Sequence, residues 1–312
     1  MRRAVMSAFG DPSVLRIQET DWPSPVRDEL LIQVHASSVN GTDLGIRAGR
    51  GPFRLVTRLP YTPGFDVAGT VVRCGPHVTA FNPGDPVFAL LGHGGGGAAD
   101  YVTVRQSRVA RAPASVPLTQ AAAVPLAGLT ALQGLRRGGA LHLLRGARVL
   151  IIGASGGIGS FGVQLAKVYG AHVTGVARAE KHGYVRSLGA DHVLLNEDLQ
   201  NEPGVWDIIL DAAPVLKLSK AQPLLSPEGM LVSVRAFPTE WPEVAALGGR
   251  RKPGFHGIQT RERGQDLAFL AALIDGGQVR IPMDRIYPLE QIAAAHRYAE
   301  GSDVRGKVVV SC

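Results

Sequence analysis

The sequence predicts an α/β protein of two domains, a partly closed β-barrel and a doubly wound parallel sheet. The chain has 312 residues, more than the ~100–200 residues that one core ordinarily holds. Its first part reads as short strands separated by glycine and proline turns, which is typical of a barrel. From residue 149 onward, apolar strands alternate with helices. This alternation is typical of a parallel sheet with helices on both faces.

The composition indicates a packed globular protein. Hydrophobic residues make up 45% of the chain and charged residues 19%, and the formal net charge is +7. The longest basic run is Arg250-Arg251-Lys252, and no basic stretch is interleaved with aromatic residues. An arginine-rich surface is therefore favoured over a nucleic-acid partner. A basic pocket for a cofactor phosphate would account for part of the excess charge.

Cysteine usage and the N-terminus bear on the compartment. The two cysteines, Cys74 and Cys312, cannot form a disulfide framework or a four-cysteine zinc lobe. The basic start Met1-Arg2-Arg3 is not followed by an apolar signal segment, since Gly10-Asp11-Pro12 interrupts it. No apolar run reaches the ~18 residues of a membrane span. We expect a cytoplasmic protein without a membrane partner.

The N-terminal strands are expected at short apolar runs, each bounded by a turn. These runs are Leu30–Val34, Asp66–Val72, Val87–Leu90 and Tyr101–Val104. The chain changes character near Pro117, and Thr119–Leu135 has a helical, alanine- and leucine-rich pattern. In the tail, Lys307–Val310 is expected as a closing strand that returns to the N-terminal domain.

The second domain is expected to alternate strands with helices. The predicted strands are Val149–Ile152, His172–Ala177, His192–Leu195, Trp206–Leu210 and Met230–Val234. The predicted helices are Gly157–Tyr169, Glu180–Leu188 and Asp266–Asp275. Continuous apolar strands joined by helices predict a parallel, doubly wound sheet.

The most informative motif is the glycine-rich turn Gly153–Gly159, which joins an apolar strand to a helix. In that setting the turn predicts a dinucleotide site, with the pyrophosphate on the helix N-terminus. Ala154 stands where the first glycine of G-x-G-x-x-G usually is. The residues expected to cradle the pyrophosphate are Gly153, Ala154, Ser155, Gly156, Gly157 and Ile158. A glycine-rich turn without a ligand is the alternative.

The end of the second strand bears on the choice of cofactor. An NAD site usually has an acid there for the ribose 2′-hydroxyl. His172–Ala177 ends without one, and Arg178 and Lys181 follow. Two cations at this place can neutralise a 2′-phosphate, which favours NADP(H). Solvated surface charges are the alternative interpretation.

Six segments, in this order, carry a resemblance to a known family. They are Ala36–Asp43, Pro63–Val71, Ala121–Gln133, Gly162–Lys167, Tyr287–Glu290 and Gly306–Val309. With them the chain resembles the zinc-independent quinone oxidoreductase (ζ-crystallin-like) branch of the medium-chain dehydrogenases/reductases. The resemblance implies a GroES-like catalytic domain over residues 1–116, completed by 276–312, and a Rossmann NADP-binding domain over 117–275. It also implies a homodimer that pairs edge strands around Phe255–Thr260.

The same resemblance bears on metal. Zinc-dependent members carry a cysteine and a Gly-His-Glu segment where this chain has Asn40-Gly41 and Gly64-Phe65-Asp66. Zinc needs three protein ligands around an open position. Asp43 and Asp66 alone do not supply them, so no metal is expected.

The remaining site residues are implied by the resemblance. Asn40 and Asp43 should line a cleft between the domains beside the nicotinamide, with Thr130 near its phosphates and Asn196 by the adenosine. The residues that should bracket the nicotinamide ring are Val234, Arg235, Ala236 and Phe237. Asn40 has an alternative role as a turn residue bonded to its own backbone. Asp43 has an alternative role as the cap of a helix at Leu44.

One departure concerns the proton donor. Many quinone reductases carry a tyrosine just after this aspartate, where the chain has Leu44-Gly45. The change predicts a wider, less polar pocket and leaves conjugate reduction of a quinone or enone, with water or a bound hydroxyl as proton source. Two alternatives stay open. One is a catalytically weak cofactor-binding protein, crystallin-like or RNA-binding. The other is an enoyl-thioester reductase with a cationic groove from Arg235 and residues 250–252.

Overall fold

The computed structural model describes residues 1–137, 144–202, 206–234 and 254–312. The chain divides into two compact units. Unit 1 comprises Met1–Leu126, Glu262–Gly277 and Ile281–Cys312, and unit 2 comprises Ala127–Arg261 and Gln278–Arg280. The expected boundaries at residues 116 and 275 differ from these. In particular, the helix at 264–275 belongs to unit 1.

Helix α9 (Gly264–Asp275) joins unit 1 because it begins against strand β7 (Val109–Arg111). A Cβ at Gly264 would lie 2.3 Å from the carbonyl oxygen of Val109. The helix can approach the strand this closely only with glycine at its first position. Sequence periodicity identifies the helix but carries no record of this contact.

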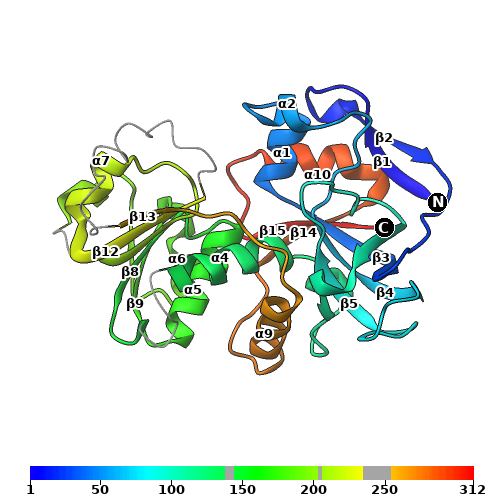
Figure 1. The fold of residues 1–312 in the computed structure, drawn as a ribbon. Helices are drawn as coiled ribbons and strands as arrows, with labels where there is room; N and C mark the ends of the chain where they lie inside the picture. Colours follow the sequence, from blue (N-terminus) through cyan, green and yellow to red (C-terminus); the bar gives the residue numbers. More distant parts are fainter. Residues whose placement is uncertain (138–143, 203–205, 235–253) are drawn as a thin grey trace. The chain divides into compact units, whose positions relative to one another are not determined.

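Unit 1 is built on a seven-stranded sheet with the order β14-β15-β3-β4-β5-β7, and β6 pairs with β3 (Figure 1). The strands of this sheet are β3 (Glu29–Val39), β4 (Asp66–Cys74), β5 (Pro86–Leu90), β6 (Tyr101–Arg105), β7, β14 (Met283–Pro288) and β15 (Lys307–Ser311). Unit 1 also contains a separate two-stranded sheet of β1 (Arg2–Met6) and β2 (Leu15–Glu19). Its helices include α1 (Gly41–Arg47), α2 (Phe53–Val56), α3 (Leu118–Ala121), α9 and α10 (Ile292–Ala299). As expected, the tail strand β15 returns to the seven-stranded sheet, antiparallel to β3.

The core of unit 1 follows the two-residue period of its strands. Leu30, Ile32 and Val34 of β3 point to one face and pack against Val67 and Val71 of β4. The separate β1–β2 ribbon was not expected from the sequence. The last three residues of β1 are all buried, so this strand shows no alternation that a sequence pattern could reveal.

Unit 2 is a six-stranded, all-parallel sheet with the order β10-β9-β8-β11-β12-β13. Its strands are β8 (Arg148–Ile152), β9 (His172–Val176), β10 (His192–Leu194), β11 (Trp206–Asp211), β12 (Leu225–Ser233) and β13 (Gly254–Gly257). The chain runs outward from β8 to β10 and then returns to place β11 on the other side of β8. This reversal confirms the doubly wound fold and puts a topological switch point between β8 and β11.

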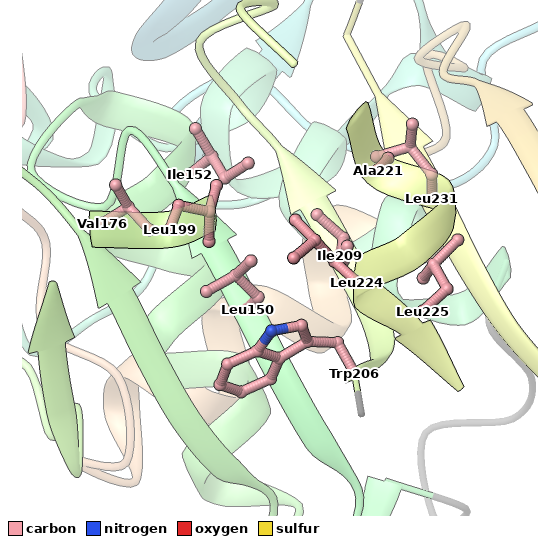
Figure 2. Close-up of a cluster of buried hydrophobic side chains, with 10 residues drawn as sticks. All are labelled: Leu150, Ile152, Val176, Leu199, Trp206, Ile209, Ala221, Leu224, Leu225 and Leu231. Atoms are coloured by element: carbon pink, nitrogen blue, oxygen red, sulfur yellow. The ribbon is translucent and has the colours of Figure 1, made fainter. Parts of the chain in front are cut away.

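Both faces of this sheet are covered, because alternate residues of each strand point in opposite directions. Figure 2 shows the cluster on one face, where short helical segments pack on the strands. Its members are Leu150, Ile152, Val176, Leu199, Trp206, Ile209, Ala221, Leu224, Leu225 and Leu231. On the other face, Gly162 of helix α5 (Gly157–Val168) lies against Ile151 and Leu210. Helix α4 (Pro125–Arg137) lies on this second face too, with Gly134 against Leu210 (Figure 1).

Two expected helices are each broken in the structure. The stretch 119–135 forms α3 and α4, and the break falls where Pro125 opens the second helix. The stretch 180–188 forms a 3-10 turn at Ala179–Lys181 and helix α6 (His182–Ser187). Among the described residues, no helix is both long enough and apolar enough to cross a bilayer.

Candidate functional site

The turn between β8 and α5 has the geometry of a phosphate cradle. Gly153 has φ +73°, a backbone conformation that residues with a Cβ rarely adopt. A Cβ at Gly159 would lie 2.2 Å from the carbonyl oxygen of Gly153. Glycine is therefore required both at the tight turn and where the helix meets the strand.

The start of α5 supplies the donors. Gly156 caps the helix without a side-chain hydrogen bond, and its own N–H donates to the Gly153 carbonyl at 3.0 Å. The N–H groups of Gly157 and Ile158 belong to the first turn, where a helix offers no carbonyl to them. With the positive end of the helix dipole, they form a ready anion site at the carboxyl end of β8.

Ala154 shows why the glycine pattern departs from the usual one here. Its N–H donates to the carbonyl of Val176 at 3.0 Å, and its side chain is fully buried. The methyl group lies 3.0 Å from where a Cβ on Gly175 would stand. The alanine thus fills a space that β9 leaves empty, and its side chain faces the sheet.

The expected 2′-phosphate residues lie at the ends of β9 and β10. Arg178 follows β9, and its side chain is exposed. Its Nε lies 3.4 Å from a carboxylate oxygen of Glu180. Asn196 is also exposed and follows β10, whose Leu194 carbonyl accepts from the Ala177 N–H at 3.1 Å. Neighbouring parallel strands end at one edge, so the structure brings Arg178 and Asn196 to the same edge of the sheet.

Lys181 differs from Arg178 in its surroundings. Its side chain is 5% exposed, within the 3-10 turn that precedes α6. The alternative of a solvated surface charge is therefore wrong for Lys181. Glu180, an acid between the two cations, is a neighbour that the sequence interpretation left out.

Asp211, at the carboxyl end of β11, was not singled out from the sequence. It is fully buried, and its Oδ2 accepts from the N–H of Leu216 at 3.2 Å and from the hydroxyl of Ser233 at 3.1 Å. Burial raises the pKa of Asp211, although the hydrogen bonds that its carboxylate accepts act to lower that pKa. The sequence signal that could have identified Asp211 is its position as an acidic residue at the end of an apolar strand. The side chain orders the switch-point edge beside the glycine turn.

The residues expected around the nicotinamide are described only in part. Thr130 of α4 is 3% exposed, and its Oγ1 lies 2.7 Å from Oγ1 of Thr260. Val234 follows β12, and its N–H donates to the Asp211 carbonyl at 3.1 Å. Arg235, Ala236 and Phe237 lie outside the described residues, as do the basic residues 250–252.

In unit 1, five residues form what we call the buried polar cluster: Ser38, Asn40, Asp43, Asp66 and Lys307. β3, β4, α1 and β15 contribute to it. Asp66 Oδ1 accepts from the N–H of Leu126 at 2.6 Å, and its Oδ2 accepts from Asn40 Nδ2 at 2.8 Å and from the Ser38 hydroxyl. Lys307 Nζ donates to Asn40 Oδ1 and to the Val39 carbonyl. Burial lowers the pKa of Lys307, against the negative charges of Asp66 and Asp43.

Asp43 takes the capping role that was the alternative to a cleft position. Its Oδ2 accepts from the Asn40 N–H at 3.0 Å and its Oδ1 from the Gly64 N–H at 2.8 Å. The helix begins at Gly41 rather than Leu44. The carboxylate is 1% exposed, so unit 1 does not present it on a surface. Burial raises the pKa of Asp43 to about 6, against the Gly64 hydrogen bond and with help from the charge of Asp66.

A neighbouring ring lies beside Gly45, where the sequence suggested more space. A Cβ at Gly45 would lie 2.9 Å from Cε2 of Phe53 in α2. The space that a side chain at residue 45 would take is thus filled by Phe53, which the sequence pattern did not connect with Gly45.

Comparison with known proteins agrees with this architecture. Residues 26–114 match the alcohol dehydrogenase GroES-like domain and residues 188–310 match the zinc-binding dehydrogenase family. The chain is 33% identical over 303 residues to a chloroplast envelope quinone oxidoreductase homolog of Arabidopsis thaliana, covering 92% of this chain and 91% of the relative. It is 34% identical over 303 residues to a quinone oxidoreductase of Sus scrofa, covering 92% and 90%.

Among solved structures, the quinone oxidoreductase from Coxiella burnetii superposes with a TM-score of 0.90 and 29% identity, covering 100% of this chain and 99% of that one. Fold and glycine turn define an oxidoreductase with a nicotinamide cofactor. Within that class, the chain belongs to the quinone oxidoreductase branch of the medium-chain dehydrogenase/reductase superfamily.

Proposed function

We propose that the protein is an NADPH-dependent, zinc-independent oxidoreductase that passes hydride to a quinone or to an α,β-unsaturated carbonyl. The observation that carries the proposal is the β8–α5 turn, where Gly159 packs on Gly153 and leaves the amides of Gly157 and Ile158 open at the switch point. A further relative supports the substrate class. The chain is 33% identical over 325 residues to the NADPH-dependent alkenal/one oxidoreductase of Arabidopsis thaliana, covering 99% of this chain and 79% of the relative.

The residues of unit 2 suit NADPH. The pyrophosphate would accept from the amides of Gly157 and Ile158, and Arg178 would pair with the 2′-phosphate. Thr130 and Val234 would hold the nicotinamide end, and Asn196 the adenosine. Bound NADPH supplies a hydride from C4.

The reaction requires no metal in this proposal, and the buried polar cluster does not suit one. Zinc binds three protein ligands and keeps an open position. Both carboxylates of the cluster already accept hydrogen bonds, and the ammonium of Lys307 stands 3.7 Å from Asp66 Oδ2. Among the described residues, no group of three His, Cys, Asp or Glu side chains could hold a metal ion.

The proposed step is balanced without a protein acid. Hydride adds to the β-carbon of the enone, the C=C electron pair moves to the carbonyl oxygen, and the enolate takes a proton from water. For a quinone, hydride and one proton give the hydroquinone. Asn40 Nδ2 already donates to Asp66 at 2.8 Å, so we assign Asn40 and Asp43 to holding the β3–α1 corner in place.

The test is turnover by purified protein of NADPH and, separately, NADH with 1,4-benzoquinones and 2-alkenones, with zinc measured in the same sample. NADPH oxidation by a quinone or enone, unchanged by chelator, is the expected result. Folded protein that binds NADPH and reduces no member of either series would instead support the cofactor-binding alternative. Activity lost with removal of stoichiometric zinc would overturn the metal-free reaction.

A further inference from the structure

The turn that follows β9 carries three charged side chains, those of Arg178, Glu180 and Lys181. Arg178 and Glu180 are 51% and 57% exposed, and Nε of Arg178 lies 3.4 Å from a carboxylate oxygen of Glu180. Lys181, by contrast, is buried. Two cations and one acid leave a single net positive charge on the turn. The acid therefore removes half of the charge that an approaching phosphate would otherwise meet.

The backbone of this turn is fixed by hydrogen bonds. The Lys181 N–H donates to the Arg178 carbonyl at 2.9 Å, which closes the 3-10 turn. On the other side of Arg178, the Ala177 N–H donates to a carbonyl of β10 at 3.1 Å. The Ala177 carbonyl lies 3.1 Å from Nε2 of His182, which must donate because a carbonyl oxygen only accepts. Glu180 is thus held two residues from Arg178, and its carboxylate stays within reach of a group that Arg178 binds.

The pair lies at the carboxyl end of β9, where a doubly wound sheet of this kind meets the ribose 2′ position of a dinucleotide. A phosphate monoester carries about −1.5 to −2 charges at pH 7 and accepts charge-assisted hydrogen bonds from arginine. To accept from Arg178, a 2′-phosphate must displace the Glu180 carboxylate and then remain beside it as a like charge. A ribose 2′-hydroxyl is uncharged, so it leaves the pair of Arg178 and Glu180 intact.

We propose that Glu180 is a specificity-determining residue, which limits the preference for NADPH over NADH by competing with the 2′-phosphate for Arg178. The placement of the cofactor rests on the proposed function, whereas the role of Glu180 can be tested by binding, apart from turnover. An acid just before α6 also interacts favourably with the helix dipole. That purely structural role would affect the two cofactors equally, so the ratio of their dissociation constants separates the two roles.

The experiment is a fluorescence titration of the whole chain with NADPH and, separately, with NADH. Glu180→Gln keeps the size of the side chain and removes its charge. It should tighten NADPH binding about 3–10-fold, as expected for the loss of an exposed competing ion pair and of a nearby like charge. NADH binding should change less than ~2-fold, because no charged group of NADH meets Glu180. Added salt should reduce the gain for NADPH, since exposed charges are screened.

Two further variants locate the effect. Glu228→Gln makes the same change of charge at an exposed residue in the amino-terminal half of β12, and it should leave the binding of both cofactors unchanged. Combining Glu180→Gln with Arg178→Ala tests whether Glu180 acts through Arg178. In the absence of the guanidinium, Glu180→Gln should change NADPH binding less than ~2-fold, which a double-mutant cycle measures. Thermal unfolding checks that each variant is folded.

The outcomes separate the role of Glu180 from the proposed function. An unchanged ratio of NADPH to NADH affinity in Glu180→Gln, an equal gain in Glu228→Gln, or an undiminished gain without Arg178 would each overturn the role of Glu180. The expected ratios, without reduction of any quinone or enone, would support that role and overturn the proposed function. Folded protein that binds neither nucleotide would overturn both.

Discussion

The ammonium of Lys307 lies 3.7 Å from Oδ2 of Asp66, and the two side chains are 4% and 0% exposed. One comes from the last strand and the other from β4, so the pair joins the C-terminal tail to the middle of the unit 1 sheet. Asn40 bridges them, since its Oδ1 accepts from Lys307 and its Nδ2 donates to Asp66.

Lys307→Met should lower the free energy of unfolding by about 3–5 kcal/mol, because it leaves the buried carboxylate of Asp66 without its counter-charge. Adding Asp66→Asn to that variant should recover part of the loss. Lys167→Met is the control: Lys167 pairs with Asp191 at 2.8 Å near the surface, and its loss should cost at most ~1 kcal/mol. Urea titration measures all three, and equal losses for the two lysines would contradict the burial argument.

The raised pKa of Asp43 predicts how the free energy of unfolding depends on pH, with a sign opposite to that expected for an acid whose pKa is lowered by folding. Its pKa rises from 3.8 in the unfolded chain to about 6 in the fold. The folded state therefore holds the proton more tightly, and its contribution to stability is complete below pH 3.8 and lost as the pH rises through 6. Relative to Asp43→Asn, the parent should lose up to ~3 kcal/mol across this window.

Asp191 provides the matched control for that titration. Burial alone would raise its pKa, but hydrogen bonds from Lys167 and the Val173 N–H hold the pKa of Asp191 below its ordinary value. Relative to Asp191→Asn, the parent should therefore lose stability as the pH falls. For each aspartate, the free energy of unfolding of the parent is compared with that of its Asn variant across the pH range. If the two differences change with pH in the same direction, the pKa of Asp43 is not raised.

Arg178→Ala should weaken NADPH binding about 10–100-fold and NADH binding little, because only NADPH carries the 2′-phosphate. Arg186→Ala, an exposed arginine of α6, should leave both unchanged. Fluorescence titration with the two cofactors measures the contrast. The same loss for NADPH and NADH would remove the argument for a 2′-phosphate contact.

Gly159→Val should abolish cofactor binding, because its side chain would collide with the Gly153 carbonyl that lies 2.2 Å from the first added carbon. Gly183→Ala, in α6, has nothing within 4 Å of the added Cβ and should keep binding while stabilising the fold by about 0.5–1 kcal/mol. NADPH titration and thermal unfolding distinguish the two. Retained binding in Gly159→Val would place the pyrophosphate elsewhere.

The edge position of β13 bears on assembly. β13 closes one end of the unit 2 sheet, and it overlaps the Phe255–Thr260 segment expected to pair across a two-fold axis. A homodimer formed there would remove an open sheet edge. Light scattering over a micromolar dilution series should give the mass of two chains. A monomer throughout would count against the pairing.

The periodic parts of the fold could be predicted from the sequence, and the close approaches could not. The strand at Val149–Ile152 and the glycines after it have local signals, so the parallel sheet and its turn were expected where they lie. The transfer of α9 to unit 1 depends on Gly264 meeting Val109. A contact between residues so far apart in the chain leaves no trace in either local pattern.

The site shows the same division. Arg178 was proposed from its place after a predicted strand and Asn196 from the family resemblance, and both lie at one edge of the sheet because neighbouring parallel strands end together. Asp43 and Lys307 belong to recognisable segments, but their burial and the bridge through Asn40 are properties of the folded sheet. Tyr61 carries no motif at all, and its buried phenol, which has no hydrogen-bond partner among the described residues, is a property of the folded chain.

The place of β15 in the unit 1 sheet sets an order for biosynthesis. β15 stands between β14 and β3, so residues Ala36–Val39 of β3 lack a partner strand on one edge until β15 has been made. Unit 2 is continuous from Ala127 to Arg261 apart from three later residues and can close while the ribosome is still translating. Until β15 has been made, this edge of β3 stays open and the buried carboxylate of Asp66 lacks its counter-charge, so unit 1 completes its sheet after unit 2 can close.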